Sequence, residues 1–163
     1  MKPEDLITYC GGYCGHCARW NENAILIRLA DVMAELVDSH GYHHWMPFEV
    51  KEFDYNEFRK ALGFFKKEDS WLVCWKACRG GDGRPDCEIR NCCRDHGLRL
   101  CFDCKEFPCP KVKENARMIE QANEYRKLGR EEWLQRQIER AEQKFEAHTE
   151  KYYQVYANKR PPA

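Results

Sequence analysis

Residues 9–17 read Tyr-Cys-Gly-Gly-Tyr-Cys-Gly-His-Cys, and this short stretch decides how the chain is expected to fold. Its first two cysteines have three residues between them and its last two have two, so the thiols fall on closely spaced turns. The intervening glycines permit the tight turns and positive φ values with which a backbone wraps around an ion. The stretch therefore predicts an irregular metal-binding loop.

Two further segments carry the other cysteines at similar spacings. Cys101 and Cys104 have two residues between them, and Cys74 and Cys78 have three. The total of 11 is odd, so complete disulfide pairing within one chain is impossible, and such short spacings suit ligands that share one ion. We expect one or two zinc ions, with ligands drawn from ten cysteines: Cys10, Cys14, Cys17, Cys74, Cys78, Cys87, Cys92, Cys101, Cys104 and Cys109.

Iron is the competing metal. The spacing of Cys10, Cys14 and Cys17 is that of a radical-SAM iron–sulfur loop, and four-cysteine ligation alone does not exclude an iron–sulfur cluster. Radical chemistry of that kind is usually housed in a large partial α/β barrel, whereas this chain is short and offers no series of strands. Zinc is therefore the primary expectation and an iron–sulfur cluster is the alternative.

One thiol near the expected ligands raises the question of catalysis. Cys93 is a spare thiol beside Cys92, but a reactive thiol needs an environment that lowers its pKa, and the sequence shows none. We expect Cys92 to be a ligand and Cys93 to face the core. His16 lies between two expected ligands and is predicted to point away from the ion.

Helical patterns separate and follow the cysteine segments. An apolar stripe with helical periodicity predicts a helix over residues 22–40 that ends at Gly41. The stripe consists of Leu26, Leu29, Met33, Leu36 and His40. Asp54 precedes Glu57 by three residues, which resembles a capping box and predicts a second, shorter helix. A third short helix is expected to be capped by Asp86 and to end near Gly97.

The chain after Lys111 contains no cysteine and has two helical patterns. The first has an apolar face from Val112 to Tyr125 and is expected to end at Gly129. The second is a heptad-like seam, which predicts a helix that packs against its own chain or, alternatively, forms a homodimer or docks a partner. The seam consists of Leu134, Ile138, Ala141, Phe145, His148, Tyr152 and Val155.

These patterns predict a mainly α fold with irregular cysteine-rich metal-binding loops and little or no sheet. We divide the chain into a cysteine-rich domain with embedded helices over residues 1–110, a C-terminal helical segment over 111–158 that packs on it, and a frayed tail over 159–163. The first three cysteines are expected to lie near the Cys101–Cys104 pair, because three thiols do not complete a tetrahedral site.

Charge and hydropathy exclude some classes of protein. The chain has 27 Lys and Arg against 27 Asp and Glu, which argues against a nucleic-acid partner. No run approaches the eighteen or so apolar residues of a membrane span, and the first residues lack the apolar stretch of a signal peptide. We therefore expect a cytoplasmic protein.

Five arginines between residues 79 and 99 are expected to offset thiolate charge and to donate hydrogen bonds around the metal.

The three cysteine segments together resemble an uncharacterised prokaryotic family known as domain of unknown function 3795. The resemblance covers residues 8–112 and rests on residues 9–17, on Cys87-Glu-Ile-Arg-Asn-Cys92 and on Cys101-Phe-Asp-Cys-Lys-Glu-Phe-Pro-Cys109. It implies a small, cysteine-rich protein that is presumed to bind zinc, and it implies no reaction. The chain departs from the family pattern in the wider Cys74–Cys78 spacing and at Arg84, where a further cysteine often stands.

The expected function is that of a zinc-binding protein whose metal is mainly structural. Such a protein acts by recognising a protein partner or a small-molecule ligand and is not itself a catalyst. The alternative is an enzyme, either a small iron–sulfur oxidoreductase or a thiol-dependent one.

Overall fold

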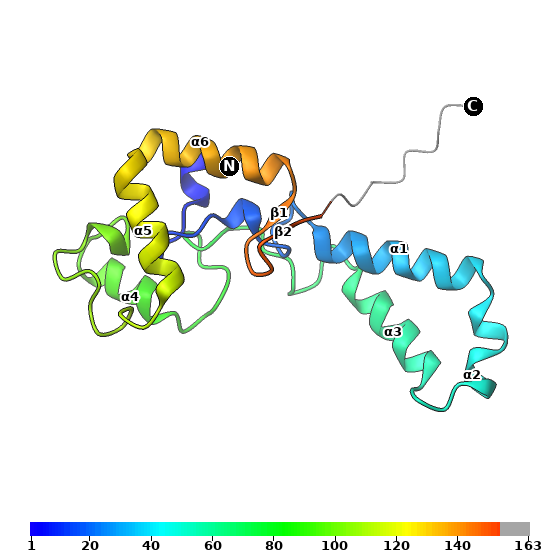
Figure 1. Ribbon diagram of the computed structural model, residues 1–163. Coiled ribbons are helices and arrows are strands. Elements are labelled where there is room, and N and C mark those ends of the chain that lie inside the picture. The colour runs from blue at the N-terminus through cyan, green and yellow to red at the C-terminus, as the bar shows by residue number, and fades with distance from the viewer. Residues whose placement is uncertain (154–163) are drawn as a thin grey trace.

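The computed structural model describes residues 1–153 and is mainly α-helical. This confirms the predicted fold class. Six α-helices and a small two-stranded sheet are found in this part of the chain. They are α1 (Ile25–Ser39), α2 (Met46–Glu49), α3 (Tyr55–Phe65), α4 (Glu88–Asp95), α5 (Ala116–Leu128), α6 (Arg130–Glu142), β1 (Phe145–Glu146) and β2 (Lys151–Tyr152). Figure 1 shows a cysteine-rich body on one side and an arm, residues 25–65, that extends from it.

The arm is a helical hairpin in which α1 leads away from the body, α2 lies at the tip and α3 returns (Figure 1). The end of α1 and the start of α3 lie at the predicted signals. Gly41 adopts a left-handed φ of 67° directly after α1, and the carboxylate of Asp54 accepts a hydrogen bond from the Glu57 N–H at 3.0 Å. These two features confirm the first two predicted helices, with the ends of α1 shifted inward to Ile25 and Ser39.

The body has one apolar core, to which no residue of the arm belongs. It joins the N-terminal residues, the cysteine loops and the last two helices, with Trp20 and Trp133 each only 2% exposed. The predicted short helix is present as α4, but Asp86 does not cap it. Its carboxylate pairs instead with Arg84 at 3.0 Å, and Cys87 takes the cap position without a side-chain hydrogen bond.

The C-terminal part follows the prediction only as far as α6. Gly129 ends α5 at a φ of 77°, as expected, and Asn115 caps its start. On α6, the early seam residues Leu134, Ile138 and Ala141 pack against the core of the same chain, which confirms the intramolecular interpretation for this part of the seam. A homodimer through this helix stays a prediction.

The prediction that the seam continues as a helix beyond Ala141 is wrong. The backbone takes a left-handed φ of 63° at Lys144, and the chain then forms a hairpin in which Phe145 pairs with Tyr152. The reason lies in Glu146, whose buried carboxylate accepts hydrogen bonds from backbone N–H groups of the hairpin and of the first cysteine loop. Val155 lies outside the described residues.

No helix within residues 1–153 combines the length and the apolar character needed to cross a membrane.

Gly11 provides a first test of the packing in the body. Its φ is 83°, and a Cβ built on it would lie 1.9 Å from the Phe102 ring. Gly11→Ala therefore combines a left-handed backbone cost with overpacking, together roughly 2–5 kcal/mol of unfolding free energy. Urea unfolding measures it. Gly97→Ala is the control, since Gly97 has a φ of 63° with nothing within 4 Å, and an equal loss in both variants would contradict the close approach to Phe102.

Candidate metal centre

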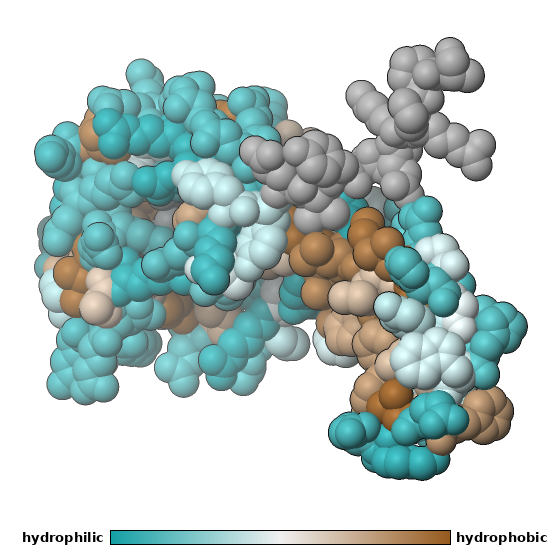
Figure 2. Space-filling view, turned by 45° about the vertical axis from the view of Figure 1, so that its right-hand side comes forward, coloured by the Kyte–Doolittle hydropathy of each residue, from teal (hydrophilic) through white to brown (hydrophobic). Residues whose placement is uncertain are grey.

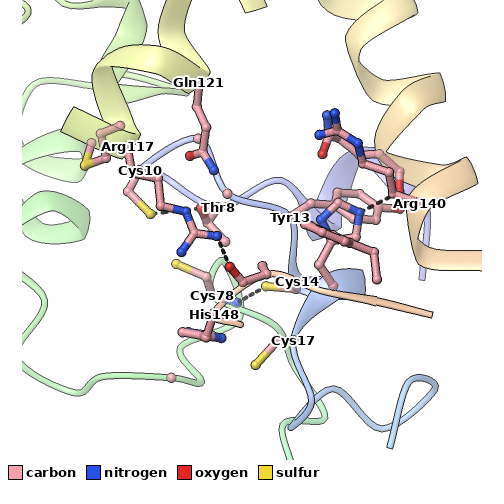
Figure 3. Close-up of a pocket in the computed structure, with 18 of the residues that line it drawn as sticks. Thr8, Cys10, Tyr13, Cys14, Cys17, Cys78, Arg117, Gln121, Arg140 and His148 are labelled. Carbon is pink, nitrogen blue, oxygen red and sulfur yellow. Dashed lines mark hydrogen bonds between the residues drawn. The ribbon is translucent and has the colours of Figure 1, made fainter. Parts of the chain in front are cut away.

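Six cysteines line one pocket of about 1230 Å³ in the body. They are Cys10, Cys14, Cys17, Cys74, Cys78 and Cys87. The pocket lies between the cysteine loops on one side and α5, α6 and the hairpin on the other. Figure 3 shows the thiols of Cys10, Cys14, Cys17 and Cys78 gathered in it. All 11 cysteines lie within the described residues and are free thiols.

Backbone hydrogen bonds bring the first and second cysteine segments together. The Cys74 N–H donates to the Arg19 carbonyl at 2.8 Å, and the Asn21 N–H donates to the Cys74 carbonyl at 3.2 Å. Further along, the Cys78 N–H donates to the Cys14 sulfur at 3.4 Å (Figure 3). Two cysteine pairs that are far apart in the sequence therefore face the same pocket.

The first group of thiols, Cys14, Cys17, Cys74 and Cys78, is close enough for its members to affect one another's ionisation. The pKa of Cys14 is raised to about 12, mainly because the thiol is buried. The Cys78 N–H opposes this shift, whereas the neighbouring thiols of Cys78, Cys17 and Cys74 raise the pKa of Cys14 further. These four side chains form an electrostatically coupled set.

The second group is formed by Cys92, Cys101, Cys104 and Cys109, none of which lines the pocket. Burial raises the pKa of Cys101 to about 11, and the thiols of Cys109, Cys104 and Cys92 add to the shift. A tight 3-10 turn places the Cys104 N–H on the Cys101 carbonyl at 3.1 Å. The second group therefore gathers around Cys101, whose pKa the other three thiols raise.

Cys10 lies between the two groups. Its thiol acts on the pKa of Cys78 in the first group and on that of Cys101 in the second, although burial is the main cause of both upward shifts. The Cys101 N–H also donates to the Tyr9 carbonyl at 2.8 Å, so the N-terminal loop lies beside the third cysteine segment, as predicted. That these segments share one ion stays a prediction.

The thiol groups do not form a closed coordination sphere. Within residues 1–153, no group of three or more His, Cys, Asp or Glu side chains is arranged to hold a metal ion. The structure therefore brings the sequence-predicted ligands into two neighbourhoods, and a metal ion would have to draw the thiols of each neighbourhood together.

Cys93 and His16 are both buried in the body. Cys93 is 2% exposed in the core, and burial raises its pKa to about 12, with smaller contributions from Cys101 and Cys92. Such a thiol is a poor nucleophile at neutral pH. His16 is 3% exposed, and its Nε2 bonds the Gln137 carbonyl of α6 at 2.7 Å. The buried position of Cys93 confirms that it faces the core, whereas His16 also lines the pocket, and its orientation relative to an ion stays a prediction.

Arg79 and Arg90 of the cysteine-rich segment donate to backbone carbonyl groups. Arg90 is 4% exposed and donates to five carbonyl groups of the loop between Cys78 and Cys87. Arg79 donates to the Ile7 and Arg99 carbonyls, each at 2.7 Å. These bonds shape the loops that carry the expected ligands, and guanidinium hydrogen bonds to the ligands of a bound metal stay a prediction.

Sequence reasoning missed the second wall of the pocket. This wall includes Arg117, Gln121, Arg140 and His148 from α5, α6 and the hairpin (Figure 3). In all, seven Lys or Arg residues and four Asp or Glu residues line the pocket. Most of this excess comes from the chain before α5, which supplies Arg19, Arg84 and Arg90 against Asp82, whereas α5, α6 and the hairpin supply four basic and three acidic residues.

Glu146 joins the hairpin of this wall to the first cysteine loop by hydrogen bonds. Burial alone would raise the pKa of its carboxyl, but hydrogen bonds from His148, from the Thr149 N–H and from the Ala18 N–H outweigh it and hold the pKa below its usual value. The Arg117 guanidinium also donates to the Ala147 carbonyl. The hairpin thereby closes one side of the pocket.

The family to which the chain belongs has no assigned function. Residues 6–114, two thirds of the sequence, match the family described as protein of unknown function DUF3795. The chain is a member of the DUF3795 family. No curated protein and no solved structure matches it. The DUF3795 match contains every cysteine, whereas α5, α6 and the hairpin lie entirely beyond it, so this chain completes the pocket with residues outside the shared region.

Proposed function

We propose that this DUF3795 protein is a metal-binding protein with two four-thiol sites, zinc being the metal, and that the metal holds its loops together. The first site consists of Cys14, Cys17, Cys74 and Cys78. The second consists of Cys92, Cys101, Cys104 and Cys109. The observation that carries the proposal is that the thiols gather in two neighbourhoods, each of which contains at least the four thiols that a structural zinc ion requires.

The chemistry of the donor set fits zinc. Thiolates are the ligands of structural zinc sites, and each proposed site includes at least one pair of cysteines two or three residues apart. The raised pKa of Cys14 and of Cys101 means that these thiols hold their protons in the metal-free chain, so metal binding would release protons to solution. Free thiols in this number also suit a reducing compartment such as the cytoplasm.

The fold of the loops supports a structural role for the metal. Between the end of α3 and the start of α5, the only helical elements are the eight residues of α4 and the turn Cys101–Asp103. Loops with so little secondary structure need other cross-links to stay ordered. We propose that the metal supplies them and that the protein acts by recognising a partner or a ligand, the basic pocket being the place where a ligand would bind.

The ligand sets are tested by native mass spectrometry of protein purified without chelators. We expect two zinc ions per chain, and one in each of the variants Cys14→Ser and Cys104→Ser. Cys93→Ala is the control, because Cys93 belongs to neither set, and it is expected to retain both ions. A wild-type chain without stoichiometric metal, or a Cys93→Ala chain that loses metal as the ligand variants do while its circular dichroism is unchanged, would refute the proposal.

An iron–sulfur cluster is the second candidate, and one observation favours it. Six cysteines around a pocket of about 1230 Å³ are more thiols, and more room, than one zinc ion needs. Visible absorption and acid-labile sulfide in the freshly isolated protein would identify a cluster, whereas a colourless protein with zinc supports the first candidate. No comparable observation favours a thiol-dependent oxidoreductase, since burial raises the pKa of the spare thiol Cys93.

A further inference from the structure

The apolar stripe that defines α1 in the sequence is exposed to solvent. Leu29, Met33 and Leu36 are 43%, 47% and 50% exposed. The helix packs along α3 and buries a different arc. That arc consists of Ile25, Ala30, Ala34 and Val37. The apolar surface of α1 therefore extends beyond the buried arc, and the long side chains of Leu29, Met33 and Leu36 lie on the exposed part.

The rest of the arm adds to this surface. Eight of the twelve large hydrophobic residues exposed in the described chain lie within residues 25–65. The aromatic side chains among them are between 38% and 69% exposed, the highest value being that of Phe48 at the tip. Figure 2 shows apolar surface concentrated on the arm, whereas the face of the body in view is mostly polar. An exposed apolar surface of this kind marks an interaction site.

We infer that the arm is a dimerisation element and that α1 packs antiparallel against α1 of a second copy of this chain. The stripe has the spacing three, four, three, four, which is the a/d repeat of helices that pack along their length. In an antiparallel pair centred on Met33, that residue lies opposite its own copy, and Leu29 lies within one residue of the level of Leu36 of the second copy. One stripe is thus complementary to itself about a twofold axis.

The residues beside the stripe permit this close approach. On α1 the flanking positions are Val32 and Ser39 on one side and Ala30 and Val37 on the other, so no charge stands between the two helices. The acidic residues of α1 that have assigned partners bind α3. Asp38 pairs with Arg59 at 2.6 Å, and Asp31 pairs with Lys66 at 3.3 Å. These charges are neutralised within one chain and do not repel the second copy.

The size of the surface fits a dimer. An aromatic side chain buries about 150–250 Å² when fully covered, so the exposed aromatic and aliphatic residues of the arm leave several hundred Å² per copy. A standard interface takes about 800 Å² from each partner. Two arms together would form a four-helix bundle, in which each α1 has both apolar arcs covered.

The inference is independent of the proposed metal sites. The arm contains no cysteine, and its residues do not belong to the core of the body. Figure 1 shows that α1 leads away from the body, which leaves its outer face accessible along the helix. A change on the stripe is therefore expected to alter the oligomeric state and to leave the metal content unchanged.

Analytical ultracentrifugation of the full chain tests the inference. We expect a wild-type dimer whose dissociation constant rises roughly thirtyfold or more in Met33→Lys, because two ammonium groups meet at the twofold axis in place of apolar side chains. Leu36→Lys is expected to weaken the dimer as well. Asn56→Lys adds the same charge at an exposed position of α3 outside the stripe and is expected to keep the wild-type constant.

Circular dichroism and metal content are measured for each variant to check that its fold is intact. Met33 is half exposed, so its replacement is expected to change neither. A wild-type chain that is monomeric at every concentration measured would overturn the inference, whether or not another protein binds the stripe. A dimer that survives both Met33→Lys and Leu36→Lys would overturn it too, because it would have to use another surface.

Discussion

Removal of the metal is expected to unfold the cysteine-rich body and to lower its melting temperature sharply. Structural zinc sites in small domains contribute about 10–16 kcal/mol of apparent binding free energy at neutral pH. That is the scale of the entire unfolding free energy of an ordinary domain, about 5–15 kcal/mol. If both proposed sites are filled, the body therefore has little stability of its own once the ions are gone.

Several core residues lie in the loops that the metal is proposed to hold, so removal of the metal is expected to disrupt the core. Leu100, Phe102 and Val112 are buried and lie in the segments that carry the second set of thiols. They pack in the same cluster as Trp20 and Trp133, which are each 2% exposed. Release of these loops is expected to expose both indoles to water and to abolish the near-ultraviolet circular dichroism of the body.

The experiment compares the melt and the near-ultraviolet spectrum before and after a chelator, and again after zinc is restored. The far-ultraviolet signal is expected to fall less than the near-ultraviolet signal, because α1 and α3 carry no ligand and share no buried residue with the body core. Restored zinc is expected to return both signals. A protein that melts at the same temperature after its metal has been removed would exclude a structural role for the ions.

The helices were predictable from sequence where a local signal starts or stops them. Asp54 caps α3 and Gly129 ends α5 because each effect depends on a neighbour a few residues away. The hairpin after α6 was not predictable, because its apolar residues fall on a heptad by spacing alone. The feature that decides against a helix there is the buried carboxylate of Glu146, whose partners include Ala18 from the opposite end of the sequence.

The candidate metal centre was likewise only partly predictable from the sequence. Spacing identified ten cysteines as candidate ligands, but it did not show which thiols are neighbours. Their grouping depends on pairings such as that of Trp20 with Cys74, which join segments more than fifty residues apart. The α1 stripe is a further example, since periodicity revealed its apolar character and only the packing of α3 showed which arc is covered.

Replacement of Arg90 is the substitution from which we expect the largest loss of stability outside the cysteines. Its guanidinium is buried and clamps the loop that joins Cys78 to Cys87. The carbonyl groups that accept its hydrogen bonds belong to Cys78, Gly81, Asp82, Arg84 and Pro85. The shortest of these bonds are 2.6 Å to Arg84 and 2.9 Å to Asp82 and Pro85.

Arg90→Met keeps the aliphatic stem and removes the clamp. We expect a loss of roughly 3–5 kcal/mol of unfolding free energy, as is typical when one partner of a buried charged network is removed. Because the loop carries Cys78, we also expect the first site to bind its metal about 10–100-fold more weakly, the usual effect of losing a group that positions a ligand. Urea unfolding and competition with a chromogenic chelator measure the two effects separately.

Two further variants distinguish the loss of the Arg90 hydrogen bonds from the loss of a positive charge. Arg90→Lys retains the positive charge, but an ammonium has three donors in place of the planar fork, so it is expected to recover only part of the loss. Arg84→Met removes an exposed arginine whose side chain pairs with Asp86 alone among residues 1–153, and it is expected to change stability by about 0.5 kcal/mol or less. If Arg90→Met costs no more than Arg84→Met, then the loop is held by other contacts, and the buried guanidinium has no part in placing Cys78.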